Sequence, residues 1–348
     1  MMEQDSSRAS VLYVGGTGTI SASCVRLSVE SGMRVTVLNR GKNLVGRELP
    51  DDVTWRSGDV TDSSSLEAAI GDDQYDSVIN FLSYDADDAQ RFVDLFTGRT
   101  RQYVHISSAS VYGKPVLQAP IVESSATHNR FLGYARAKLR AEHVLEDAYA
   151  TRDFPVTIVR PSHTYDDANP PLPGAWTVVN RIASGREIPV HGDGTSLWTL
   201  THADDFAVGL VGLLDNPRAI GETFHITGDD VYTWDQIYTI IGEAVGVEAR
   251  LVHVPSELFP VVAPDWFWSE LLIGDLAHSA VFDNAKIRRF VPSFSPKLTF
   301  HRAARRMIDW QQTHPTETAA DPATDAVLDR VVDAYHAGRA AFAQRAPK

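Results

Sequence analysis

A glycine turn between a short apolar strand and a helix-like stretch constrains the fold of this chain more than any other feature. Residues 11–14 (VLYV) are apolar β-formers, Gly15-Gly-Thr-Gly18 follows, and a helix-like stretch runs on to Gly32. Gly15 permits a tight turn, Gly18 permits close approach to a pyrophosphate, and the helix N-terminus offers free N–H groups and a positive dipole end. The turn therefore predicts a phosphate-binding site, with a plain βα turn as the alternative.

The alternation of strand and helix continues through the N-terminal half. Further apolar strand-like segments stand at residues 34–38, 53–55, 77–81, 102–106 and 156–159. Regular βα alternation predicts a parallel sheet with helices on both faces, and ligands then lie at the carboxyl ends of the strands. We expect an α/β protein: a doubly wound parallel sheet (Rossmann fold) with a smaller C-terminal substrate-binding region.

A chain of 348 residues predicts one large domain or two coupled domains. We expect the nucleotide-binding domain at residues 9–165, rejoined by about 199–228. The substrate-binding region then comprises residues 166–198, which begin in a loop rich in Pro, Asp and Asn, and residues 229–312. Residues 313–348 are expected to form a linker and a C-terminal helix.

Charge and cysteine content exclude several function classes. The formal net charge is −13 and no Lys/Arg block stands out, which argues against a broad nucleic-acid surface. The single cysteine, Cys24, excludes an intramolecular disulfide framework, and the histidines show no metal-ligand spacing, so no metal is predicted. The N-terminus is polar and no apolar run approaches bilayer length, so we expect a cytoplasmic protein without a membrane partner.

The end of the second predicted strand bears on the choice of cofactor. An acidic residue at this position suits NAD, whereas a nearby Arg suits the 2′-phosphate of NADP. This chain has Asn39, Arg40 and Lys42 there, so NADP is modestly favoured over NAD. The alternative is that Arg40 and Lys42 are solvated loop charges.

Tyr134 and Lys138 stand four residues apart in a segment that lacks Gly and Pro and is expected to be helical. This spacing places both side chains on one face of a helix, about one turn apart. The ammonium of Lys138 can stabilise a phenolate, and a tyrosine that loses and regains its proton can act as a general base for a hydroxyl. An isolated pair of this kind is more often an ordinary solvated face.

Taken together, the motifs resemble those of the extended short-chain dehydrogenase/reductase family, in its NAD(P)-dependent epimerase/dehydratase branch. The resemblance covers roughly residues 10–300 and rests on the order and spacing of GGTGTIS (15–21), GDVTD (58–62), HISSASVYG (105–113), YARAK (134–138) and VTIVRPSHTY (156–165). Ser21 departs from the third glycine of the family turn but is small enough for close packing.

The resemblance implies a role for each matching residue. Ser108 would hold the reacting oxygen, Tyr134 would be the acid/base, and Lys138 would hold the nicotinamide ribose and lower the tyrosine pKa. The expected cofactor contacts besides Tyr134 and Lys138 are Gly15, Gly18, Thr19, Ile20, Asn39, Arg40, Asp59, Val60, Asn80, Phe81, Pro161 and Ser162. We interpret Ser107 and Ser110 as residues that cap backbone groups.

The chain departs from the family pattern in the substrate region. Ala109 and Ser110 replace the Asp-Glu pair of the dehydratases, so that elimination lacks its acid and base. His163 stands where many sugar-nucleotide enzymes have Asn, and Trp198 stands where they have Arg. The diphosphate clamp is therefore in doubt, although Arg181, Arg288 or Arg289 could replace it. The expected substrate contacts are Ser110, His163, Trp198 and Arg289.

The aromatic stretch at residues 258–268 has two interpretations of equal weight: a wall over the substrate, or a small second core or dimer contact. The function that the resemblance favours is NAD(P)-dependent epimerisation of a sugar or sugar-nucleotide-like substrate through a transient ketone. The first alternative is a net NADP(H)-dependent reductase or dehydrogenase, and the second is a non-catalytic RNA-binding or regulatory protein on the same fold. The resemblance also predicts a homodimer that pairs helices near 88–98 and 133–150.

Overall fold

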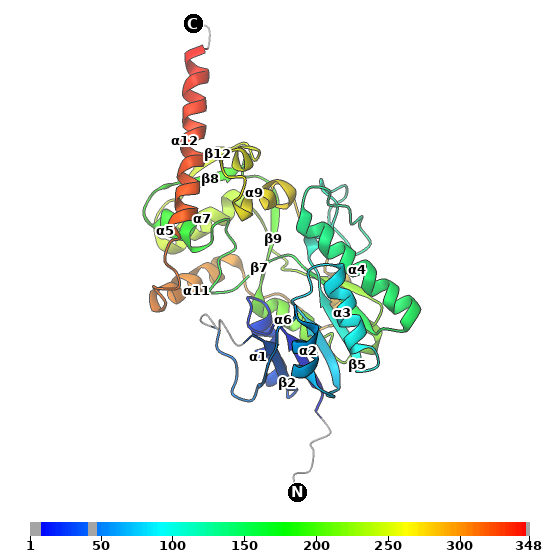
Figure 1. Ribbon diagram of the computed structural model, residues 1–348. Helices are drawn as coiled ribbons and strands as arrows, with labels where there is room; N and C mark the ends of the chain where they lie inside the picture. The colour runs from blue at the N-terminus through cyan, green and yellow to red at the C-terminus, as the bar shows by residue number, and fades with distance from the viewer. Residues whose placement is uncertain (1–7, 41–46, 346–348) are drawn as a thin grey trace.

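The computed structural model describes residues 8–40 and 47–345, and its N-terminal half is built on one large sheet (Figure 1). Seven strands lie in the order β10-β6-β5-β4-β1-β2-β3, and every neighbouring pair is parallel. The strands are β1 (Ser10–Val14), β2 (Arg34–Asn39), β3 (Thr54–Ser57), β4 (Tyr75–Asn80), β5 (Thr100–Ile106), β6 (Val156–Pro161) and β10 (Thr223–Ile226). The predicted doubly wound parallel sheet is confirmed.

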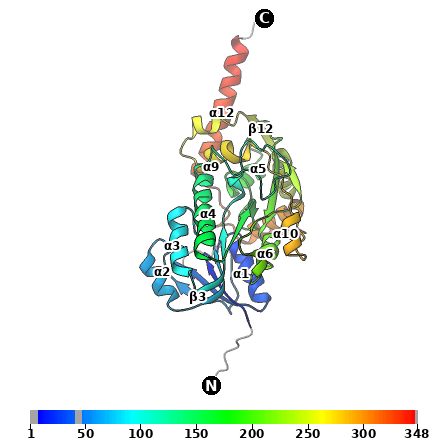
Figure 2. The same ribbon diagram turned by 90° about the vertical axis from the view of Figure 1, so that its right-hand side faces the viewer.

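Helices cover both faces of this sheet (Figure 2). One face carries α1 (Ser21–Glu30), α6 (Ala203–Val211) and α10 (Ala285–Phe290), and the other carries α2 (Ser63–Ile70), α3 (Ala86–Phe96) and α4 (Gly133–Arg152). Alternation along β1 explains the two cores, because Val11 and Tyr13 pack on the α1 face whereas Leu12 and Val14 pack on the α2–α4 face.

The order of the strands places a crevice at the carboxyl end of β1. This strand pairs with β2 on one side and with β4 on the other, with Val14 opposite Leu38 and Asn80. The chain therefore winds away from β1 in opposite directions, which makes this point a topological switch where ligands bind in open α/β sheets.

The C-terminal half builds a second core around two small sheets. One has the order β11-β9-β7 and the other pairs β12 with β8. Their strands are β7 (His163–Tyr165), β8 (Glu187–His191), β9 (Leu197–His202), β11 (Val231–Thr233) and β12 (Arg250–Val254). Strand β9 belongs to a small sheet, and the chain returns to the large sheet with α6 and β10. The expected domain bounds stay a prediction.

Helices complete this half: α5 (Trp176–Ala183), α7 (Trp234–Val245), α8 (Leu258–Val262), α9 (Phe267–Leu271), the π-helix η3 (Leu272–Leu276), α11 (Phe300–Thr313) and α12 (Pro322–Arg345), with short 3₁₀ turns η1 (Ala109–Val111) and η2 (Pro217–Ala219) elsewhere. The predicted C-terminal helix is α12, whose first half packs Leu328 and Val331 into the second core and whose end extends away from the body (Figure 1). Within the described residues no helix has the length and apolar character to cross a bilayer. Pairing of two copies through α3 and α4 stays a prediction.

Candidate active site

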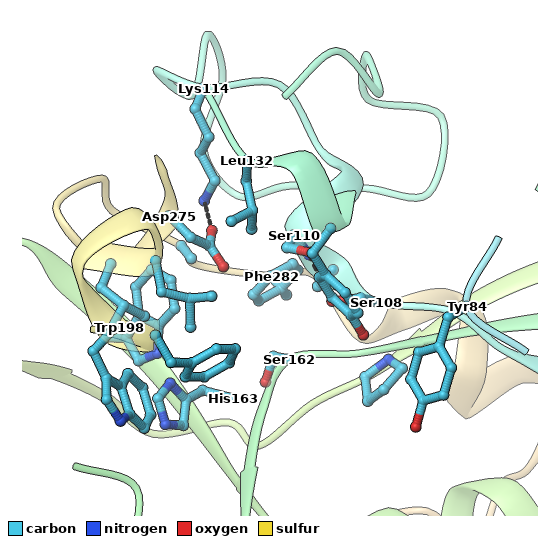
Figure 3. Close-up of a pocket in the computed structure, with 18 residues that line it drawn as sticks. Tyr84, Ser108, Ser110, Lys114, Leu132, Ser162, His163, Trp198, Asp275 and Phe282 are labelled. Carbon is cyan, nitrogen blue, oxygen red and sulfur yellow. Dashed lines mark hydrogen bonds and ion pairs between the residues drawn. The ribbon is translucent and has the colours of Figure 1, made fainter. Parts of the chain in front are cut away.

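Two cavities meet at the carboxyl ends of the strands of the large sheet. The first, about 810 Å³, runs along the glycine turn and the ends of β1, β2 and β4, and we call it the nucleotide cavity. The second, about 520 Å³, extends between the large sheet and the C-terminal half, and we call it the substrate cavity (Figure 3). Both cavities are lined by Tyr84, Ser108, Tyr134, Pro161 and Ser162.

The glycine turn has the backbone that its sequence predicts. Gly15 has a φ of +86°, and a Cβ there would lie 2.7 Å from Leu82 Cγ, so only glycine fits. Helix α1 begins at Ser21, and its N-cap residue Ile20 offers no capping side chain. An external anion can satisfy the first N–H groups of such a helix, so the turn fits a dinucleotide pyrophosphate.

One end of the nucleotide cavity is lined by Asn39, Arg40, Asp59 and Val60, the residues that we expect beside the adenosine. Asp59 Oδ1 accepts hydrogen bonds from Thr61 N at 3.0 Å and from Thr61 Oγ1 at 2.8 Å, and these bonds lower the pKa of the carboxyl. Asp59 is thus both a turn residue and a wall of the cavity. Lys42, the second cation of the predicted NADP preference, lies outside the described residues.

One predicted cofactor contact does not reach the nucleotide cavity. Asn80 is fully buried; its amide donates to Tyr103 Oη at 2.8 Å and its Oδ1 accepts from Leu82 N at 2.8 Å. Asn80 therefore shapes the end of β4 from within the protein, and its neighbour Phe81 lines the cavity. All the other predicted cofactor contacts line it as well.

Arg47 lines the nucleotide cavity although no motif pointed to it. Its Nε lies 2.6 Å from Asp166 Oδ2, and its Nη2 lies 3.4 Å from Thr19 Oγ1. The ion pair thus brings the start of the C-terminal half against the glycine turn. Residues so far apart in the sequence carry no local signal of such a contact.

Ser108, Tyr134 and Lys138 all line the nucleotide cavity, and Ser108 and Tyr134 also line the substrate cavity. Ser108 Oγ lies 2.8 Å from Ser110 Oγ, and Tyr134 is 41% exposed toward the cavities. Lys138 is buried, and its Nζ donates to Ser83 O at 2.6 Å and to Ile106 O at 2.9 Å. The predicted i,i+4 pair therefore shares one face of α4, with Nζ 5.9 Å from the centre of the Tyr134 ring.

Burial shifts the pKa values of both members of this pair. Burial raises the pKa of Tyr134 to about 12, assisted by Tyr84 and opposed by a hydrogen bond with Ser108. Burial also lowers the pKa of Lys138 to about 8, although the charges of Asp88 and Glu142 oppose this shift. The ammonium is held by two carbonyl oxygens, and the expected lowering of the tyrosine pKa by Lys138 stays a prediction. At neutral pH Tyr134 is a proton donor.

This protonation state predicts different pH profiles for the two directions of an alcohol–ketone reaction. Only the phenolate can accept a proton from an alcohol, and its fraction rises tenfold per pH unit below a pKa of about 12. We expect kcat for alcohol oxidation to rise about tenfold per unit between about pH 5 and 7, below the pKa of Lys138 at about 8, whereas ketone reduction stays nearly flat. Initial rates followed by nicotinamide absorbance test this, and a flat oxidation profile contradicts it.

The interpretation of Ser107 and Ser110 as backbone caps is wrong. Ser108 caps η1, because its Oγ accepts a hydrogen bond from Ser110 N at 3.2 Å. Ser107 Oγ instead donates to the buried carboxylate of Glu142, and Ser110 Oγ bonds Ser108 Oγ in the substrate cavity. Ser110 therefore lines the cavity as a predicted substrate contact.

The structure brings three of the four predicted substrate contacts together. Ser110, His163 and Trp198 line the substrate cavity (Figure 3), whereas Arg289 is exposed on α10 and lines neither cavity. The other arginines considered for a diphosphate clamp are engaged elsewhere. Arg181 pairs with Asp325 at 2.6 Å, and Arg288 pairs with Asp229 at 2.5 Å.

The aromatic stretch at residues 258–268 is divided between the second core and the wall of the substrate cavity. Phe259 is buried and stacks with Trp266 in the second core, whereas Phe267 and Trp268 line the substrate cavity. His163 lies against this wall, with the centre of its ring 6.3 Å from the centre of the Trp268 ring. Burial lowers the pKa of His163 to about 4, so the ring is neutral at pH 7.

Comparisons with known proteins agree with this geometry. The sequence pattern of the NAD dependent epimerase/dehydratase family matches residues 11–227. A 2′-dehydrokanamycin reductase of Streptomyces kanamyceticus is 27% identical over 85% of this chain and 82% of its own. The chloroplast stem-loop binding protein of 41 kDa b of Arabidopsis thaliana is 26% identical over 73% of this chain and 68% of its own.

Solved structures share the fold. An epimerase from Methanothermobacter thermautotrophicus superposes with a TM-score of 0.74 at 18% identity, covering 89% of this chain and 94% of that one. UDP-glucose 4-epimerase from Bifidobacterium longum, solved with NAD⁺ and UDP, has a TM-score of 0.70 at 20% identity, covering 88% of this chain and 99% of that one.

Proposed function

This chain belongs to the NAD dependent epimerase/dehydratase family, and we propose that it transfers hydride between NAD(P) and the secondary-alcohol carbon of a carbohydrate-like ring. One observation carries the proposal: Ser108 and Tyr134 line both the nucleotide cavity and the substrate cavity. An alcohol or ketone oxygen can therefore meet an acid/base and a hydrogen-bonding hydroxyl at the junction of the two cavities.

The residues of this chain transfer the proton and orient the reacting oxygen. The nicotinamide, when bound, supplies or accepts the hydride. In the reducing direction the Tyr134 hydroxyl donates its proton to the oxygen that was the ketone, while Ser108 orients that oxygen. Lys138 ties α4 to the carbonyls that end β5 and follow β4, which holds Tyr134 opposite Ser108.

We propose that the net reaction is reduction of a ketone, or its reverse, rather than epimerisation. An epimerase must return the hydride to the opposite face of the ring, so the bound ketone has to turn over while a distant group stays anchored. The resemblance places Trp198 and His163 at the positions of the family's diphosphate-binding residues; both line the substrate cavity, and His163 is neutral at pH 7. The relative named 2′-dehydrokanamycin reductase, which matches most of both chains, also supports reduction.

Epimerisation is the second candidate, supported by the family and by a 26% identical relative named UDP-glucose 4-epimerase from Pasteurella multocida. A non-catalytic RNA-binding role has the chloroplast stem-loop binding relative in its favour. The formal net charge of −13 and the convergence of Ser108, Tyr134 and Lys138 count against that role.

The state of the cofactor after purification separates reduction from epimerisation. A net reductase exchanges its nucleotide in every turnover, so we expect the purified protein to hold little nucleotide and to require added cofactor, with NADPH preferred because Arg40 lines the end of the cavity where we expect the adenosine. Denaturation followed by absorbance and mass measurement identifies any nucleotide that is released. Stoichiometric retained nucleotide would contradict net reduction and favour the epimerase cycle.

A further inference from the structure

A buried ion pair that the proposed mechanism does not use lines the substrate cavity. Lys114 Nζ lies 2.9 Å from Asp275 Oδ1, and the two side chains are 1% and 13% exposed. Figure 3 shows them pointing toward each other. Lys114 lies in the loop after η1, whereas Asp275 lies in the π-helix η3, a helix distortion that is frequent at functional sites.

The pair keeps hydrogen-bonding capacity that the protein does not use. Among the described residues no donor bonds Asp275 Oδ2, and no acceptor other than Asp275 bonds Lys114 Nζ. Asp275 Oδ2 is therefore available to a ligand, and so is the donor capacity that Lys114 Nζ retains beside its contact with the Trp198 ring, whose centre lies 5.3 Å away. Replacing a buried pair by apolar residues often leaves stability unchanged, so stability alone is a weak reason to place two charges here.

The rest of the cavity is mostly apolar, with hydroxyl groups and His163 as its polar lining, and it carries no net positive charge. Lys114 is the only cation among the described residues that line it, and Asp275 balances that charge at close range. His163 adds none, because burial lowers its pKa to about 4. Most of the remaining wall consists of Ala109, Leu132, Trp198, Phe267, Trp268, Leu271, Leu276, Ala280 and Phe282. A diphosphate would lose its hydration in this cavity without gaining a compensating charge.

We propose that Lys114 and Asp275 together recognise neighbouring hydroxyl groups of an uncharged ring, a free sugar or cyclitol, rather than a nucleoside diphosphate sugar. The carboxylate accepts a hydrogen bond from one hydroxyl and the ammonium donates to the oxygen of the next. The indole faces of Trp198 and Trp268 suit the C–H face of such a ring. This inference rests on the proposed function, because it names the substrate of the same site.

Binding of defined probes tests the class of ligand. The protein saturated with NADP⁺ is titrated in a calorimeter with D-glucose, D-galactose and myo-inositol, and separately with UDP and UDP-glucose. We expect at least one free ring to bind and UDP to produce no binding heat up to about 1 mM. Binding of UDP or UDP-glucose, or binding of none of the probes, overturns the inference.

Two variants show whether the pair makes the contact. Asp275→Asn and Lys114→Gln are each expected to weaken binding of the free ring about 10- to 100-fold and to leave NADP⁺ binding unchanged. Asp73→Asn is the matched control, since it removes a carboxylate from the exposed Arg56–Asp73 pair. Equal binding of the free ring by these variants and the control overturns the inference.

Further measurements separate this inference from the proposed function. The double variant Lys114→Met/Asp275→Leu removes both charges and leaves no unpaired buried charge, so we expect it to stay folded. We expect it to lose binding of the free ring. This result holds even where a single variant folds poorly. Hydride transfer with UDP-glucose that disappears in Tyr134→Phe would keep the proposed function and overturn the inference. Ring binding that depends on Asp275 but never leads to hydride transfer would keep the inference and contradict the proposed function.

Discussion

The Tyr134→Phe variant is expected to lower kcat by about 10²- to 10⁴-fold, the range typical for loss of a positioned general acid or base. The phenol of Tyr134 lies at the junction of the two cavities beside Ser108 and holds its proton at neutral pH, because burial raises its pKa to about 12. Phenylalanine keeps the ring and the packing of α4 but removes the proton. The loss should therefore appear in kcat, with the affinity for NADP⁺ nearly unchanged.

Stopped-flow and steady-state absorbance of the nicotinamide measure this rate, and quenching of protein fluorescence measures cofactor binding. Tyr149→Phe is the matched control, since Tyr149 lies on the same helix, is 44% exposed and lines neither cavity. We expect that control to keep its full rate. A Tyr134→Phe enzyme with undiminished kcat would remove Tyr134 from the mechanism and leave the site as a binding surface.

The parts of the site that lie in local sequence patterns could be predicted. The glycine turn can be recognised in the sequence because Gly15 must adopt a positive φ next to Leu82, and few residues other than glycine do so. Tyr134 and Lys138 are visible because helical periodicity alone places them on one face. The alternating strands predict the parallel sheet, and the carboxyl ends of its strands line the nucleotide cavity.

The parts that depend on tertiary pairing could not be predicted. Lys114 and Asp275 meet only because the C-terminal half folds back over η1, and neither belongs to a motif. Asn80 follows a strand just as Asn39 does, yet its amide is bonded inside the protein to Tyr103. A strand end therefore predicts that a residue is near the cofactor, whereas the direction of its side chain depends on neighbours that are distant in the sequence.

Further along the face of α4 that carries Tyr134 and Lys138, a buried carboxylate holds the helix in place. Glu142 lies two turns beyond Tyr134, and its fully buried carboxylate accepts from Arg160 Nη2 at 2.6 Å and from Arg160 Nε at 3.0 Å. Ser107, which precedes Ser108, donates to the same carboxylate. Burial alone would lower the pKa of Arg160. The hydrogen bond and the charge of Glu142 outweigh this effect and raise the pKa. One carboxylate thus joins α4 to the ends of β5 and β6.

Glu142→Ala is expected to destabilise the protein by about 3–5 kcal/mol, because it leaves the guanidinium of Arg160 buried without a counter-charge. Thermal and urea unfolding measure the change. Glu146→Ala, one turn further along α4 and exposed, is the matched control and should have little effect. A Glu142→Ala protein as stable as this control would show that water or another group compensates Arg160.

The double variant Glu142→Leu/Arg160→Leu separates the effect of the buried charges on stability from the effect of the ion-pair contact on the position of Tyr134. Replacing both members of a buried ion pair by apolar residues is often neutral for stability, so we expect the double variant to unfold close to the wild type. Its kcat should nevertheless stay low, because Ser107 loses its acceptor and α4 loses its link to β6, which leaves Tyr134 less well placed against Ser108. A double variant that recovers both stability and kcat would assign Glu142 a purely electrostatic role in folding. Recovery of stability alone would identify Glu142 and Arg160 as positioning residues for the acid/base.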